Sequence, residues 1–193
     1  MDIPYETVAL AASGDQEACR SIVEALHRPM LSTIHRFLGR RFAEEVEDVA
    51  QEVFLKVFRT LDRFDPGRGV KFSTWVFTFV RNHCFDVLKK KRLRTISMQE
   101  DGADGEVRSW ELEDGTERRP EHLTLSAELG DEIEKAMATL NEEQRMVFIL
   151  REFEQLDLRS IAEIMDCSEG TVKSRLHRAK EAMKQRLAPY LRT

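Results

Sequence analysis

A short basic segment near the C-terminus, SEGTVKSRLHRAK over Ser168 to Lys180, carries side chains that could contact nucleic acid. It has four Lys and Arg residues and one carboxylate, although the whole chain has 35 Asp and Glu against 30 Lys and Arg. At 100° per residue, its apolar side chains share one line of a helix, namely Val172, Leu176, Ala179 and Met183. The opposite face carries Ser174, His177 and Arg178, with Lys173 and Arg175 on its flanks.

Hydroxyl, imidazole and guanidinium groups on one helix face suit the DNA major groove, because they can bond base edges while flanking cations neutralise phosphates. The preceding residues predict a partner helix over Leu158 to Met165, a tight turn at Asp166-Cys167, and Ser168 as the cap of the second helix. The alternative is an ordinary solvated face on a small bundle. The helix pair, the cap and the short turn together favour DNA binding.

A second patterned helix is predicted in VEDVAQEVFLKVFRTL. Its apolar side consists of Val46, Val49, Ala50, Val53, Phe54, Val57 and Phe58. The other side carries Asp48, Gln51, Glu52, Leu55 and Arg59. A protein partner would explain Leu55 on this polar ridge, although a single exposed leucine is also ordinary. Asp48 and Glu52 at i, i+4 suggest a metal or acid–base pair, but the sequence offers no obvious third ligand, so we expect no catalytic residue, metal or cofactor.

A third candidate segment, FSTWVFTFVRNHCFDVLKKKR, begins with aromatic residues, has Arg81 and Asn82 in its middle and ends in cations. Aromatic faces, amides and cations are what single-stranded DNA requires for stacking, base edges and backbone. The alternative is that the aromatics are core residues and the basic run complements the helix dipole. We accept the core interpretation for most aromatics, but the four adjacent cations from Lys89 to Arg92 exceed what a helix end requires.

The elements that position these residues are predicted to be nearly all helical, because no stretch shows sustained strand alternation. Asp15 is a candidate cap for a first helix that ends before Pro29. The further helices are expected over Met30 to Leu38, about Glu44 to Leu61, and Thr74 to Arg92 with Ser73 or Thr74 at its start. The Pro-Gly pair in FDPGRG, Phe64 to Gly69, predicts a turn.

The segment from Thr95 to Glu134 has 13 acidic residues and three arginines, and its middle is poor in apolar residues. Such a composition predicts a flexible acidic linker. Periodicity returns near Leu125. We therefore expect an all-α chain of two small helical domains, residues 1–94 and 125–193, joined by a linker over residues 95–124.

Composition excludes several classes of protein. No apolar run approaches the roughly 20 residues that a membrane-spanning helix needs, and no basic region precedes the short apolar patch at the N-terminus. Cys19, Cys84 and Cys167 are far apart and form no CxxC pair, which favours free thiols over disulfides or a zinc site. We therefore expect a cytoplasmic protein without membrane insertion.

With these motifs in order, the sequence resembles the extracytoplasmic-function (ECF) sigma factors, small two-domain bacterial transcription initiation factors. The resemblance covers about Gly14 to Arg92 and Leu125 to Leu191. DVAQEVFLKVF resembles region 2.2, which docks on the clamp helices of the RNA polymerase β′ subunit. The resemblance therefore implies core-polymerase contacts by Asp48, Gln51, Glu52 and Leu55.

The second and third motifs resemble the promoter-reading regions of the same family. FSTWVFTFVRNHCFDVLKKKR is similar to the regions that melt and read the minus-ten element, where Asn82 and the loop from Phe64 to Phe72 would hold a flipped non-template base. The implied minus-ten contacts are Phe64, Arg81, Asn82, Lys89, Lys90, Lys91 and Arg92. The C-terminal helix pair resembles region 4, which reads the minus-thirty-five element. Its implied contacts are Ser168, Thr171, Lys173, Ser174, Arg175, His177 and Arg178.

The resemblance implies a non-enzymatic specificity subunit without cofactors. Its partners would be core RNA polymerase through the β′ clamp helices and the β flap, promoter DNA, and an anti-sigma protein. Three positions depart from the family pattern: Asn141 replaces a proline, Gln155 a glycine, and Thr78 a frequently basic residue. The alternatives are a stand-alone helix-turn-helix regulator of duplex DNA and a hydrolase or nuclease that uses Asp48 and Glu52.

Overall fold

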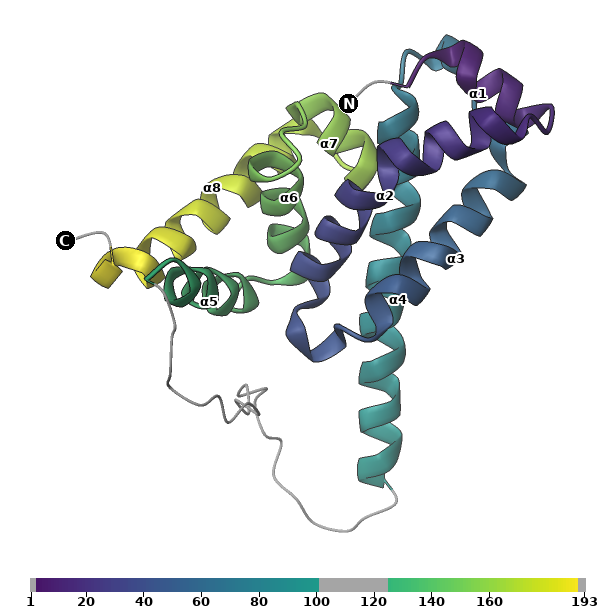
Figure 1. Ribbon diagram of the computed structural model, residues 1–193. Helices are drawn as coiled ribbons and strands as arrows, with labels where there is room; N and C mark the ends of the chain where they lie inside the picture. Colours follow the sequence, from purple (N-terminus) through teal and green to yellow (C-terminus); the bar gives the residue numbers. More distant parts are fainter. Residues whose placement is uncertain (1–2, 101–124, 191–193) are drawn as a thin grey trace.

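The structure is a computed structural model that describes residues 3–100 and 125–190 (Figure 1). The N-terminal block contains α1 (Tyr5–Ala12), α2 (Gln16–Leu38), α3 (Glu45–Arg59) and α4 (Phe72–Glu100), with short 3-10 turns η1 (Arg40–Phe42), η2 (Leu61–Arg63) and η3 (Pro66–Arg68). The C-terminal block contains α5 (Leu125–Ala138), α6 (Glu142–Glu152), α7 (Leu158–Met165), α8 (Glu169–Leu187) and the 3-10 turn η4 (Ala188–Tyr190). The described residues form no strand, and the prediction of an all-α chain is confirmed.

Helix α2 runs without interruption through Pro29, so the expected break before Met30 is wrong. A proline inside a helix removes one backbone hydrogen bond and crowds the preceding turn, at a cost of about 3 kcal/mol. The buried side chains on both sides of Pro29 lie along one stripe: Ile22, Leu26, Met30, Ile34 and Phe37. Each fully buried side chain of this kind contributes roughly 1.5–3 kcal/mol, so burial of the stripe outweighs the proline.

Helix α4 begins at Phe72, before the residues predicted to cap it. Ser73 and Thr74 are inside the helix and almost fully buried, at 2% and 1% exposure, which corrects their expected role as caps. The helix also continues to Glu100, past the predicted end at Arg92. The backbone of residues 95–100, assigned to the linker by composition, is therefore helical, and residues 101–124 lie outside the described part of the chain.

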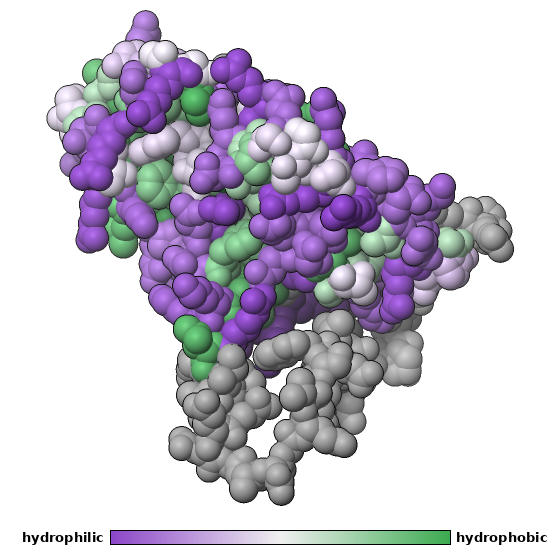
Figure 2. Space-filling model, turned by 180° about the vertical axis from the view of Figure 1, so that it is seen from behind, coloured by the Kyte–Doolittle hydropathy of each residue, from purple (hydrophilic) through white to green (hydrophobic). Residues whose placement is uncertain are grey.

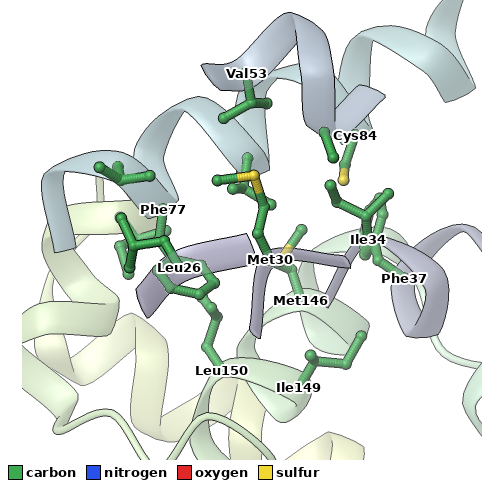
Figure 3. Packing of buried hydrophobic residues seen from close by; sticks show 14 of the residues in the cluster. Leu26, Met30, Ile34, Phe37, Val53, Phe77, Cys84, Met146, Ile149 and Leu150 are labelled. Atoms are coloured by element: carbon green, nitrogen blue, oxygen red, sulfur yellow. The ribbon is translucent and has the colours of Figure 1, made fainter. Parts of the chain in front are cut away.

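The two blocks share one hydrophobic core. Side chains from α2, α3, α4 and α6 meet there, and Figure 3 shows among them Leu26, Met30, Ile34, Phe37, Val53, Phe77, Cys84, Met146, Ile149 and Leu150. Helix α6 packs against α2, and α7 packs against α4 (Figure 1). A sequence pattern indicates which face of each helix is apolar but not which block covers it, so this packing was not predicted.

Polar contacts surround this shared core. The Thr33 hydroxyl donates a hydrogen bond to Glu154 Oε1 at 2.9 Å, and the Arg36 guanidinium lies 4.2 Å from the centre of the Phe153 ring. Arg40 of the 3-10 turn η1 forms ion pairs with Asp131 and Glu134 of α5. Arg92 forms an ion pair with Glu142 at the start of α6. Each pair joins the N-terminal block to the C-terminal block.

The outer surface is mostly hydrophilic on the face shown in Figure 2, with small apolar patches between hydrophilic residues. Among the described residues, no helix is both long enough and apolar enough to cross a membrane.

Candidate polymerase and nucleic-acid interfaces

The C-terminal helix pair has the geometry that the sequence predicts. Asp157 caps α7 by accepting a hydrogen bond from the Ser160 backbone N–H at 2.8 Å, and this bond lowers the pKa of Asp157. Asp166 ends α7 in the left-handed region at φ 52°, where aspartate is tolerated. Ser168 then caps α8 by accepting from the Thr171 backbone N–H at 3.1 Å. The turn is therefore short, and the two helices are held at fixed positions.

Helix α8 buries one stripe and exposes the other. Val172, Ala179 and Met183 are buried, whereas the predicted contact residues Lys173, Ser174, His177 and Arg178 are exposed. The Ser174 hydroxyl donates to the Thr171 carbonyl at 3.0 Å. The exposed face thus presents an imidazole, a guanidinium and an ammonium group.

Arg175 and Thr171 are more constrained than the other members of this set. Arg175 Nη2 lies 2.5 Å from Glu143 Oε2, and its Nη1 donates to Cys167 Sγ at 3.5 Å. These contacts hold the guanidinium against α6 and the turn, with the side chain only 19% exposed. The Thr171 hydroxyl is within hydrogen-bond distance of the Ser168 hydroxyl at 3.0 Å. In this conformation, Arg175 points away from the exposed face of α8.

Helix α3 presents its predicted ridge to solvent. Asp48, Gln51, Glu52 and Leu55 occur at i, i+3, i+4 and i+7, so they lie on one side of the helix. All four are exposed, and Leu55 is 56% exposed. The opposite side, formed by Val46, Val49, Ala50, Val53 and Val57, is buried. The ridge is therefore a continuous surface on a helix that the core holds in place.

His83 lies beside this ridge, and the sequence interpretation did not include it. Its Nδ1 is 3.5 Å from Glu52 Oε2, across the α3–α4 contact. Burial lowers the pKa of His83, and the nearby Lys56 acts in the same direction, while Glu52 opposes them. The described residues contain no group of three His, Cys, Asp or Glu side chains that could hold a metal. The histidine extends the ridge without completing a metal site there.

The polar middle of α4 brings two predicted minus-ten residues into contact. Arg81 Nη1 donates a hydrogen bond to Asn82 Oδ1 at 2.8 Å, and the Arg81 guanidinium lies 5.1 Å from the centre of the Phe85 ring. Asn82 is exposed, and Lys89 follows it by seven residues on the same side of the helix. Thr78, where the family frequently has a cation, donates its hydroxyl to the Trp75 carbonyl at 2.6 Å.

The four cations at the end of this motif have different surroundings. Lys89 and Lys90 are exposed. Lys91 lies 4.0 Å from the centre of the Phe42 ring and 3.9 Å from Glu45, and Arg92 pairs with Glu142 of the other block. The basic run is therefore two exposed lysines followed by two cations that contact the protein.

Phe64 lies at the start of the predicted base-binding loop, in a cluster of aromatic rings. Its ring is 5.1 Å from that of Phe72 and 5.6 Å from that of Trp75, which is 4.8 Å from that of Phe79. A pocket of about 340 Å³ opens beside Phe64. The loop forms one side of it and the N-terminal residues from Ile3 to Tyr5 form the other. The sequence interpretation missed these N-terminal residues, because only the fold brings them to the loop.

Two protein families match the chain in the order of its two blocks. Sigma-70 region 2 matches residues 22–94, and Sigma-70, region 4, matches residues 130–183. The chain is 34% identical over 176 residues to the ECF RNA polymerase sigma factor SigW of Bacillus subtilis, covering 90% of this chain and 91% of the relative. The chain belongs to the ECF sigma factors.

A second relative of this sigma factor comes from a different bacterium. The chain is 34% identical over 183 residues to the ECF RNA polymerase sigma-E factor of Escherichia coli K12, and the match covers 93% of this chain and 91% of that protein. Matches over nearly the whole length, including the N-terminal block, support a sigma factor over a stand-alone helix-turn-helix regulator. The sigma factor is thus a transcription initiation factor of RNA polymerase.

Solved structures share the fold of this sigma factor at lower sequence identity. CnrH in complex with the cytosolic domain of CnrY matches with a TM-score of 0.67 and 22% identity, covering 95% of this chain and 96% of CnrH. The sigma factor RpoE in complex with the anti-sigma factor NepR from Bartonella quintana matches with a TM-score of 0.64 and 22% identity, covering 88% of this chain and 96% of RpoE. These matches show that the arrangement of helices is that of sigma factors.

Proposed function

We propose that this sigma factor binds core RNA polymerase through the α3 ridge of Asp48, Gln51, Glu52 and Leu55. The supporting observation is that these side chains form one exposed line on a helix whose opposite side is fixed in the core. A leucine surrounded by polar groups suits a hot spot, because a partner can desolvate it while the polar rim keeps the free surface soluble. By family resemblance, the partner surface is the clamp helices of the β′ subunit.

The N-terminal block reads the opened minus-ten element in this proposal. Asn82 supplies an exposed amide for base edges, and Lys89 and Lys90 supply exposed cations for phosphates. Phe64 offers an aromatic ring in the loop before α4. Arg81 orients Asn82 through its hydrogen bond to Oδ1, which leaves the amide nitrogen of Asn82 to donate to a base. Lys91 and Arg92 bind DNA only after they leave Phe42 and Glu142.

The C-terminal block reads the minus-thirty-five element through α8. The exposed Ser174, His177 and Arg178 face the base edges, and Lys173 contacts phosphate. Arg175 positions α8 through Glu143 and the turn. By family resemblance, the same block also contacts the β flap of the polymerase.

The two blocks separate when they act on a promoter. The two elements are about 25 base pairs apart, or roughly 85 Å at 3.4 Å per base pair. In the present packing, α7 contacts both α4 and α8. Because packed helix axes are about 8–10 Å apart, α4 and α8 are within roughly 20 Å of each other around α7. The functional units are residues 1–94 and 125–193, and residues 95–124 connect them.

We include an anti-sigma protein among the partners. CnrH and RpoE, which share the fold, were each solved with a partner bound, CnrY in one case and the anti-sigma factor NepR in the other. A protein that binds across both blocks of this chain would favour the packed arrangement over the separated one, since a ligand shifts an equilibrium toward the state it binds better.

Run-off transcription tests the proposal. Purified core polymerase is mixed with the full chain and a library of genomic fragments from the source bacterium, and the transcripts are mapped. We expect transcripts from a set of promoters that core polymerase alone, or core with the variant Leu55→Asp, does not use. If the chain binds core polymerase but adds no promoter preference, the proposed function is wrong.

A further inference from the structure

The pocket beside Phe64 has two walls from distant parts of the sequence. Its volume is about 340 Å³, within the roughly 300–1,000 Å³ typical of ligand pockets. One wall comes from the loop before α4, with Phe64, Pro66, Val70, Lys71 and Phe72. The other wall comes from the N-terminus, with Ile3, Pro4 and Tyr5. Helix α1 packs against η2, which immediately precedes the loop, and this contact holds the two walls together.

The pocket has buried apolar residues at its floor and exposed residues at its mouth. Ile3 and Phe72 are buried at 8% and 2% exposure and form an apolar floor. Tyr5 is 55% exposed and Lys71 is exposed, so both lie at the mouth. An apolar floor, an aromatic ring and a cation at the rim suit a nucleobase with its adjoining phosphate, because the ring stacks on the base while the cation neutralises the backbone.

We propose that the segment from Ile3 to Tyr5 completes a nucleobase pocket, in which the Tyr5 ring stacks on one unpaired base of the promoter and Lys71 contacts the neighbouring phosphate. This inference rests on the proposed function, since it needs the non-template strand to be exposed at the minus-ten element. It adds a specificity-determining residue outside the motifs that the sequence pattern indicates.

Charge around the rim is consistent with an anionic neighbour that arrives only when the blocks separate. In the packed arrangement, Asp157 at the start of α7 is close enough to Lys71 for the lysine to help lower the pKa of Asp157. Separation of the blocks removes this carboxylate from Lys71. A phosphate then takes the place of the carboxylate without competing with it.

Helix α1 provides a matched control. Leu10 is 55% exposed, the same as Tyr5, and lies five residues later in α1, but it is not part of the pocket. Substitution of either residue therefore removes an exposed apolar side chain from α1. Only substitution of Tyr5 also removes a wall of the pocket. The variant Tyr5→Leu keeps apolar bulk without the ring, and Tyr5→Phe keeps the ring without the hydroxyl.

The experiment measures binding of holoenzyme to single-stranded oligonucleotides with the non-template sequence of a minus-ten element mapped by run-off transcription. In one series, each base in turn is replaced by an abasic site, and affinity is followed by fluorescence anisotropy. We expect one position at which the wild type loses roughly 5- to 150-fold in affinity, the range of one base–aromatic stack. Tyr5→Ala and Tyr5→Leu should show a similar loss on the intact strand and little further loss at that position. Tyr5→Phe and Leu10→Ala should behave as the wild type.

Equal affinity of Tyr5→Ala and wild type for the intact strand would overturn the inference, as would an undiminished abasic effect in Tyr5→Ala at every position. Thermal unfolding of each variant shows whether α1 remains folded, and Tyr5→Leu carries the test if Tyr5→Ala does not fold. If the wild type itself forms no active holoenzyme, the proposed function fails. If the wild type transcribes and the Tyr5 variants bind normally, only the pocket inference fails.

Discussion

The guanidinium of Arg145 in α6 donates a hydrogen bond to the backbone carbonyl of Phe37 in α2 at 3.0 Å, although the two residues are 108 positions apart. The same guanidinium donates to the carbonyls of Met137, Ala138 and Leu140, each at 3.0 Å. The α2 and α5 carbonyls are those that helix ends leave without an internal partner. One side chain therefore joins the ends of two helices to a third, and it does so across the two blocks.

Replacement of Arg145 should destabilise the whole chain. Arg145→Met keeps much of the apolar stem but removes the guanidinium donor from four carbonyls. Among the described residues, only the Met137 carbonyl of these four keeps another bond, from the Leu140 N–H, so we expect the free energy of unfolding to fall by about 2–4 kcal/mol. Urea denaturation followed by circular dichroism measures this change. Arg151→Met is the matched control, because Arg151 makes one exposed hydrogen bond, to Leu156 within its own block. Equal losses in the two variants would contradict a special role for Arg145.

The contact between Thr33 and Glu154 should make the packing of the blocks sensitive to pH. Burial raises the pKa of Glu154, while the hydrogen bond from Thr33 and the charge of Arg36 oppose the rise. Because the pKa of Glu154 is higher in the folded state than in the unfolded state, the folded state binds more protons at pH values between the two. Stability is therefore greatest below the unfolded pKa of Glu154 and is lost as the pH rises through the folded one.

The variant Glu154→Gln tests this dependence, since its amide oxygen can still accept the Thr33 hydroxyl but does not titrate. We expect Glu154→Gln to be more stable than the wild type at about pH 8, and the difference to shrink at about pH 5, closer to the ordinary glutamate pKa. Chemical denaturation at the two pH values measures both differences. Glu181→Gln, at an exposed position in α8, controls for removal of a surface charge. A difference that does not change with pH would rule out titration of Glu154 as the cause.

Replacement of Gln155 by glycine should remove backbone strain. Gln155 has φ 55°, in the left-handed region that costs a residue with a side chain about 1 kcal/mol or more. Glycine has no such penalty but loses more chain entropy on folding, so we expect Gln155→Gly to raise the free energy of unfolding by about 0.5–1 kcal/mol. The melting temperature measures the gain. Arg151→Gly, inside α6, should be destabilising by a similar amount, and stabilisation by both glycines would show that φ is not the reason.

Leu55 should carry much of the affinity for core polymerase. Leu55→Asp replaces the only apolar member of the α3 ridge with a carboxylate, and we expect a loss of about 2 kcal/mol in binding, or roughly 30-fold, without a change in melting temperature. Titration of labelled variant into core polymerase measures the affinity. Leu10→Asp, at an equally exposed leucine of the same block, should bind as the wild type. Unchanged affinity of Leu55→Asp for core polymerase would show that the ridge is not part of the interface.

Two side chains of α8 should have different effects on promoter choice. Arg178→Ala, at a proposed base-edge contact, should cost about 1–3 kcal/mol and relax preference at one position of the minus-thirty-five element. Lys173→Ala should weaken binding to all sequences alike. It should also lower the slope of log affinity against log salt concentration by about one unit. Transcription from a library of minus-thirty-five variants at two salt concentrations distinguishes the two. Uniform losses in both variants would mean that α8 only clamps phosphates.

The helix-turn-helix could be predicted in detail because its signals are local. Ser168 caps the helix that its sequence marks, and the predicted partner helix has the bounds of α7. Apolar spacing likewise predicted the buried side of α3. Local signals failed where tertiary packing outweighed them: Pro29 did not end α2, and Ser73 and Thr74 became buried helix residues instead of caps.

Candidate sites were predictable to a similar degree. Spacing in one helix placed Asp48, Gln51, Glu52 and Leu55 on one exposed side. The neighbour of Glu52, His83, could not be found this way, because the α3–α4 contact alone brings it near. Nor could Tyr5, whose role as a pocket wall depends on how α1 packs.

The continuous core between α2, α4 and α6 limits how the halves of this chain can be recombined. A chimera that takes its C-terminal half from a relative keeps the Phe37 carbonyl and Thr33, but it needs an arginine at position 145 and an acceptor at position 154 to match them. Without these partners, the Phe37 carbonyl and the Thr33 hydroxyl lose the hydrogen bonds that join the two blocks. A chimera that exchanges the C-terminal block therefore keeps the packed arrangement of this protein only if Arg145 and an acceptor at position 154 are exchanged together with α8.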